Sequence, residues 1–140
     1  MSGLAAAVGD LLERFAAGGP QMRLIDHLGE HRLTSTIERL AYRTAQELLR
    51  NVLKHADATS VDLSIRIDGE MLRLDVVDDG RGFDPEVEIG ASSFGLVSCR
   101  QLLELAGGTL TMTSRQGEGT HATAHLPVGG VERRILGDSA

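Results

Sequence analysis

The sequence predicts an α+β fold, a two-layer α/β sandwich in which helices cover one face of a mixed, mostly antiparallel sheet. Three observations indicate this class: an amphipathic helical pattern over residues 34–56, a β-hairpin pattern over residues 61–76, and two short strand patterns near the C-terminal end. A length of 140 residues suits one compact domain with a single core.

The first two elements are short. A helix is predicted over residues 4–17, because apolar side chains recur there at helical spacing. The Gly-Gly-Pro sequence of residues 18–20 ends this helix. A strand is expected over residues 22–28, followed by a polar loop over residues 29–33.

The strongest helical pattern covers residues 34–56. Ser35 or Thr36 is expected to cap its start, with Glu38 three residues after Ser35 as in a capping box. One face is apolar and contains Ala41, Ala45, Leu48, Leu49, Val52 and Ala56. A polar stripe lies roughly opposite and contains Arg43, Glu47, Asn51 and Lys54.

A β-hairpin follows this helix. Apolar and polar residues alternate over residues 61–67 and again over residues 72–76, and the sequence Asp68-Gly69 between them is typical of a two-residue turn. This turn predicts that Ile65 pairs with Leu72, and that each other inward pair is also apolar. The same alternation places Asp78 on the apolar side of the sheet.

The C-terminal half continues with a polar loop, a helix and two strands. The loop is expected over residues 84–93, the helix over residues 94–106 with Gly-Gly after it, and the strands over residues 110–114 and 120–126. Thr120 is expected to face inward after a glycine turn. The expected division is residues 1–20 as an N-terminal helix, 21–128 as the main domain and 129–140 as a loose tail.

Composition excludes several classes of function. The net charge of −6 disfavours a general nucleic-acid role, which usually needs a basic surface. The single cysteine, Cys99, excludes an intrachain disulfide and is interpreted as a packing residue. The chain contains no apolar run long enough to cross a membrane and no signal peptide, so a cytoplasmic domain is expected, in a parent protein that could be membrane-anchored.

The sequence Asp78-Asp-Gly-Arg-Gly-Phe83 indicates a ligand site, because a carboxylate on the apolar side precedes two glycines that permit close backbone approach. With three other motifs in order, the chain resembles the GHKL, or Bergerat-fold, ATP-binding domain of sensor histidine kinases, of the group paired with LuxR-type response regulators. The matching segments are residues 42–56 (N box), 78–83 (G1), 94–108 (G2) and 117–120 (G3). Four boxes in this order are more specific than one glycine motif.

The resemblance implies an adenine site around Asp78. This aspartate resembles the one that accepts a hydrogen bond from the adenine amino group, since a carboxylate can only accept. Gly80, Gly82 and Phe83 belong to the same G1 box. Thr120 could support Asp78 or the base through water. The ordinary alternative for Asp78 is a turn or strand-end acid.

The resemblance also implies a magnesium and phosphate site on the long helix. Asn51 resembles the Mg²⁺ ligand, and Glu47, one turn earlier, is expected to act near the metal or as a base. Lys54 and His55 resemble a basic pair beside the phosphates. A solvated helix face is the alternative for Glu47 and Asn51, and a packing role is the alternative for His55.

In the G2 box, Gly95 and Leu96 resemble residues whose backbone N–H groups hold a phosphate at a helix start. Ser93 departs from the family pattern, because a glycine usually occupies that position, but its hydroxyl can still reach a phosphate, so it is kept as a nucleotide-binding candidate. Arg100 is either a phosphate contact or a surface charge. His27 and His31 lie outside any helical motif typical of a phosphoacceptor.

The function implied is binding of Mg-ATP and transfer of the γ-phosphoryl group to a histidine on a dimerisation domain, for which the chain has no matching segment, with a LuxR-type response regulator downstream. The predicted helix over residues 4–17 could be the last turns of the second helix of such a domain. Two alternatives remain: a stand-alone serine kinase of the anti-sigma-factor type, and an ATP-binding module without transfer. No direct nucleic-acid partner is expected.

Overall fold

Five strands form one mixed sheet in the order β1-β2-β3-β5-β4. The computed structural model describes residues 3–29, 33–55, 57–82, 94–115 and 117–128. The helices and strands are, in chain order, α1 (Leu4–Ala16), β1 (Gln21–Asp26), α2 (Ser35–His55), β2 (Ser60–Asp68), β3 (Met71–Asp78), α4 (Phe94–Leu105), β4 (Thr109–Ser114) and β5 (Thr120–Pro127). Only β1 and β2 pair in parallel; the other pairs are antiparallel.

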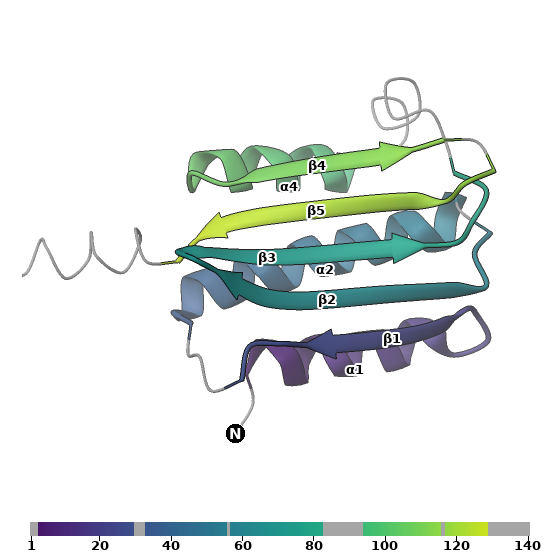
Figure 1. Cartoon of the computed structure of the whole chain (residues 1–140), viewed down its shortest axis with the longest axis horizontal. Helices are drawn as coiled ribbons and strands as arrows, with labels where there is room; N and C mark the ends of the chain where they lie inside the picture. The colour runs from purple at the N-terminus through teal and green to yellow at the C-terminus, as the bar shows by residue number, and fades with distance from the viewer. Residues whose placement is uncertain (1–2, 30–32, 56, 83–93, 116, 129–140) are drawn as a thin grey trace, which may run out of the picture.

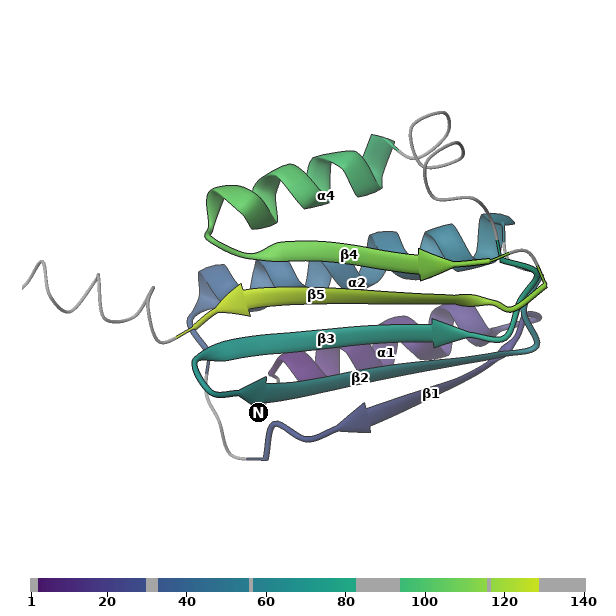
Figure 2. The same cartoon turned by 45° about the horizontal axis from the view of Figure 1, so that its top comes forward.

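The helices of the described residues lie together on one face of this sheet, as Figure 1 and the turned view of Figure 2 show. Helix α2 lies behind the middle of the sheet, with α1 behind β1 and β2 and α4 beside β4. The architecture therefore confirms the predicted two-layer sandwich. No helix in the described part of the chain combines the length and the apolar character that a membrane span needs.

The core fills the space between the helices and the inward face of the sheet. Helix α2 contributes Ala45, Leu48 and Leu49, and the hairpin contributes Leu63 and Ile65, all with 1% exposure or less. Cys99 of α4 is also fully buried, and its Sγ lies 3.9 Å from the carbonyl oxygen of Arg43 on α2. Cys99 thus packs α4 against α2, as the sequence predicted.

Helix α1 packs in the same core rather than apart from it. Leu4, Val8, Leu11 and Leu12 are buried, and the helix contacts β1 and α2. The division of the chain at residue 20 stays a prediction.

The start of α2 differs from the prediction by one residue. Thr34, not Ser35 or Thr36, is the capping residue, because its Oγ1 accepts a hydrogen bond from the backbone N–H of Ile37 at 3.3 Å. Ser35 is already helical. A cap must lie outside the helix with extended backbone, so the predicted capping box is wrong.

The hairpin register is wrong by two residues. Ile65 pairs with Leu74 rather than Leu72, and the two-residue loop is Gly69-Glu70, because Asp68 still pairs with Met71. Gly69 has φ 66°, at the first loop position where type II′ turns favour glycine. A shift of two leaves every side chain on its predicted face, so Asp78 stays on the helix side, opposite Val61.

Candidate functional site

The predicted site residues that the structure describes gather at one end of the molecule. The C-terminal ends of α2 and β3 and the N-terminal ends of β5 and α4 all lie at this end, at the right of Figure 1. This arrangement follows from the topology, because β3 runs toward this end and β5, its antiparallel neighbour, begins there.

Asp78 is the buried carboxylate of this region. It is 6% exposed, and its Oδ1 accepts a hydrogen bond from the backbone N–H of Gly80 at 2.8 Å. Burial raises the pKa of Asp78 above its ordinary value, while hydrogen bonds from the backbone of Gly80 and Thr120 act against this rise. A buried acid with few donors favours a ligand that brings its own hydrogen-bond donor.

Thr120 lies directly opposite Asp78 in the sheet register and is 6% exposed. Its hydroxyl and that of Ser114 share a hydrogen bond at 2.9 Å, and Ser114 also donates to the carbonyl oxygen of Gly119 at 3.1 Å. These bonds fix the start of β5 beside the carboxylate.

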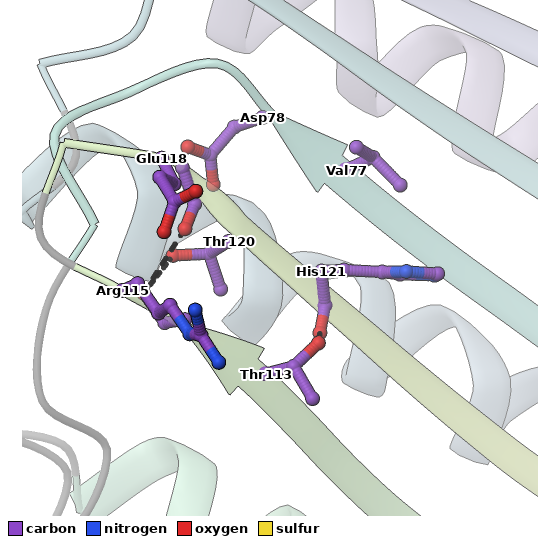
Figure 3. Close-up of a pocket in the computed structure, with 9 residues that line it drawn as sticks. Val77, Asp78, Thr113, Arg115, Glu118, Thr120 and His121 are labelled. Atoms are coloured by element: carbon purple, nitrogen blue, oxygen red, sulfur yellow. Dashed lines mark hydrogen bonds between the residues drawn. The ribbon is translucent and has the colours of Figure 1, made fainter.

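A pocket of about 300 Å³ opens at this point (Figure 3). Its lining comes from the ends of β3, β4 and β5, and consists of Val77, Asp78, Thr113, Ser114, Arg115, Glu118, Gly119, Thr120 and His121. Figure 3 shows the side chains of Asp78 and Thr120 close together, with His121 extending away from them. The sequence did not assign a role to Arg115, which lies outside the predicted boxes, or to Glu118, which lies within the G3 box but was not singled out.

On α2, the predicted polar stripe is not uniformly solvated. Asn51 is 7% exposed and the Glu47 side chain is 15% exposed, whereas Arg43 and Lys54 are exposed. The placement of this stripe opposite the apolar face is therefore wrong for Asn51, which the helix turns toward the protein.

Glu47 lies against the start of α4. A Cβ atom built on Gly95 would be 2.4 Å from Glu47 Oε1, so any larger residue there would displace the end of the Glu47 side chain. Arg50 Nη1 donates to the same oxygen at 3.3 Å. The carboxylate thus joins the stripe on α2 to the first turn of α4, where backbone N–H groups are free of helical partners.

The other predicted residues have different placements. Leu96 is 3% exposed and belongs to the core, so only its backbone remains available to a ligand. Gly80 and Gly82 are buried in the turn after β3. His55 ends α2, although its side chain is outside the described part. Phe83, Ser93 and the predicted loop over residues 84–93 also lie outside the described residues.

A second polar cluster lies on the sheet face away from the helices. Asp75 is 8% exposed and accepts hydrogen bonds from Arg73 Nε and Thr123 Oγ1, each at 2.8 Å, with His121 Nε2 also at 2.8 Å. Burial raises the pKa of Asp75, but its hydrogen bonds outweigh burial and lower it overall. The polar groups of this cluster hydrogen-bond to one another, and the cluster contains none of the predicted site residues.

Comparison with known proteins identifies the family. Residues 36–130 match the family described as histidine kinase-, DNA gyrase B-, and HSP90-like ATPase. The chain belongs to this ATPase family. The match includes all the predicted site residues, and membership implies a nucleotide-binding domain.

Individual relatives agree with this assignment. The chain is 30% identical over 126 residues to sensor histidine kinase LiaS of Bacillus subtilis (strain 168), covering 90% of this chain and 34% of the relative. It therefore spans about a third of that protein's length. This chain is thus an ATPase domain homologous to those of sensor histidine kinases.

Solved structures show the same fold. The histidine kinase domain of the blue-light activated histidine kinase of Erythrobacter litoralis EL346 superposes with a TM-score of 0.74 and 25% identity, covering 91% of this chain and 62% of that one. A second structure of that kinase gives a TM-score of 0.70 at 23% identity, covering 91% and 46%, and supports the fold alone.

Proposed function

We propose that this domain binds ATP with Mg²⁺ and transfers the γ-phosphoryl group to a histidine of a dimerisation domain of a sensor kinase, which in turn serves a LuxR-type response regulator. The observation that carries this proposal is Asp78, a carboxylate buried on the helix side of the sheet and hydrogen-bonded to Gly80 N–H at 2.8 Å. In this proposal its remaining acceptor capacity receives the adenine amino group.

The residues at the end of α2 fit a magnesium ion held together with phosphate oxygens. Mg²⁺ in nucleotide sites usually takes one or two protein oxygens and completes its shell with phosphates and water. The Asn51 amide oxygen is a ligand of this type, on a nearly buried side chain. Bound Mg²⁺ would neutralise charge on the phosphates. The exposed Lys54 ammonium supplies a further positive charge at the same helix end.

Glu47 is the proposed base. In the transfer step a nitrogen of the incoming imidazole forms a bond to the γ-phosphorus, and the bond from that phosphorus to the bridging oxygen of ADP breaks. The proton of the imidazole passes to the Glu47 carboxylate. Its position against Gly95 supports this role, because the first turn of α4 is where a phosphate is expected.

Calorimetric titration of the chain with ATP, with and without Mg²⁺, tests this function. Asp78→Asn should weaken ATP affinity by at least about tenfold, because an amide can turn a donor toward adenine's donor and a charge-assisted hydrogen bond contributes about 1.5–3 kcal/mol. Asn51→Ala should mainly remove the increase in ATP affinity that Mg²⁺ causes.

Asp62→Asn is the matched control, since Asp62 pairs with the exposed Arg23 on β1, on the outer face of the sheet. Equal affinities of the wild-type chain and Asp78→Asn for ATP would overturn the adenine assignment. Binding that is normal in Asn51→Ala and equally dependent on Mg²⁺ would overturn the metal assignment.

A further inference from the structure

Asp79 forms a compact set of hydrogen bonds that the proposed site does not use. Its Oδ1 accepts from the backbone N–H groups of Thr59 and Ser60, both at 2.9 Å, and its Oδ2 accepts from the Thr59 hydroxyl at 2.5 Å. In return, the backbone N–H of Asp79 donates to the carbonyl oxygen of Ser60 at 3.3 Å. Both carboxylate oxygens of this exposed side chain are therefore engaged by one short segment.

That segment connects the two halves of the proposed site. Thr59 lies between the end of α2, which carries Asn51, and β2, and Ser60 is the first residue of β2. Asp57 in the same connection has φ 51°, a left-handed conformation that non-glycine residues rarely adopt. Residues 57–60 thus follow a defined path, and Asp79 contacts this segment where it joins the sheet.

The turn after β3, which contains Asp79, is also packed on its opposite side. Gly119 has φ 77°, and a Cβ built on it would lie 2.2 Å from the carbonyl oxygen of Asp78 and 3.3 Å from Cα of Asp79. Two residues further along each segment, the backbone N–H of Gly117 donates to the carbonyl oxygen of Arg81. The turn that follows Asp78 is therefore packed between the residue 59–60 segment and the hairpin loop before β5.

We infer that Asp79 is a positioning residue for nucleotide binding: it anchors the turn after β3 to the segment that follows α2, and so places the Asp78 carboxylate relative to Asn51. This inference rests on the proposed adenine contact of Asp78. Asp79 itself does not touch the nucleotide, since both its oxygens face Thr59 and Ser60. Its effect on binding must pass through the neighbouring carboxylate.

The test is a double-mutant cycle on ATP affinity, measured by calorimetry on the full chain. Asp79→Ala leaves two backbone donors without their acceptor, and should weaken ATP binding about tenfold. In the Asp78→Asn background the same change should have less than about a twofold effect, because the contact that it positions is already lost. Equal effects of Asp79→Ala in the two backgrounds would overturn the positioning role.

Milder variants keep the proposal testable where Asp79→Ala does not fold. Thr59→Val removes only the hydroxyl donor and should weaken ATP binding about threefold. Thr59→Ser keeps the hydroxyl donor and should bind ATP with wild-type affinity. Asp62→Asn again serves as the control of the same chemistry on β2. Wild-type affinity in Thr59→Val and in a folded Asp79→Ala would contradict the inference.

The two proposals fail in distinguishable ways. If Asp78→Asn binds ATP like the wild type, the adenine contact itself is wrong. If Asp78→Asn loses affinity while folded Asp79→Ala and Thr59→Val do not, only the positioning role is wrong.

Discussion

At the scale of single residues, the two adjacent aspartates have opposite environments. Burial raises the pKa of Asp78, whereas hydrogen bonds from the Thr59 side chain and the backbone of Ser60 and Thr59 lower the pKa of Asp79 to about 2. Strand alternation explains the difference, because one side chain faces the helices and the other turns outward to the segment before β2. One carboxylate remains available to a ligand and the other holds the backbone.

These shifts predict opposite effects on stability as pH changes. The lowered pKa of Asp79 gives stability that is present above its ordinary value of 3.8 and is lost as pH falls toward about 2. Asp79→Ala should therefore flatten the fall in the free energy of unfolding between about pH 4 and about pH 2. Urea unfolding at several pH values measures this slope, and an unchanged slope would contradict the assignment.

The raised pKa of Asp78 has the opposite sign. Its stabilising contribution is present at low pH and is lost as pH rises through the raised value, so the ionised carboxylate destabilises the fold at neutral pH. Asp78→Asn, in the same unfolding series, should be at least as stable as the wild type near neutral pH. In this account the aspartate that contacts the nucleotide is then not the one whose ionisation stabilises the fold.

At the scale of elements, α2 and α4 meet through Glu47 and Gly95. Gly95→Ala would place a methyl group about 2.4 Å from Glu47 Oε1, and the flexible end of that side chain would have to move. We expect the melting temperature to change little, while phosphoryl transfer to an added histidine-bearing dimerisation domain, measured as ADP released, falls about tenfold or more.

The same substitution in a Glu47→Gln background is the control for this prediction. There it should cause no further loss, because the carboxylate that it displaces is absent. A Gly95→Ala protein with wild-type turnover would show that the position of Glu47 against α4 is unimportant.

The sequence predicted the elements well and their fine alignment less well. Alternation of apolar residues placed Asp78 on the helix side even though the pairing register of the hairpin was wrong by two residues, since an even shift leaves each side chain on the same face. Thr34 was missed as the cap because Ser35 fits the same sequence rule. A local sequence rule cannot choose between two neighbouring residues, such as Thr34 and Ser35, that both fit it.

Asp79 and Thr59 were missed for a different reason. Alternation places Asp79 on the outward side, where a carboxylate is usually solvated, and no motif marks Thr59. Their contact joins residues 20 positions apart, and it exists only once the connection after α2 reaches the end of β3. In the sequence, the only hint of a role for Asp79 was its position next to Asp78. Its contact with Thr59 can be recognised only when the folded path of residues 57–60 is known.

At the scale of the whole molecule, the sheet and the helix layer bring four separate chain segments to one end (Figures 1 and 2). The central strands supply Asp78 and Thr120, while α2 and α4 supply Asn51, Glu47 and a helix start. The polar cluster around Asp75 lies on the other face of the sheet, so the proposed nucleotide chemistry is confined to the helix side.

The central claim is that Asp78 recognises the adenine amino group, and base selectivity tests it most directly. Inosine triphosphate differs from ATP at the position of that amino group, where it offers an acceptor. Calorimetry should show that the wild-type chain binds ATP at least about tenfold more tightly than inosine triphosphate, and that Asp78→Asn loses or reverses this preference. Equal affinities of the wild-type chain for the two nucleotides, or an unchanged preference in Asp78→Asn, would contradict the account.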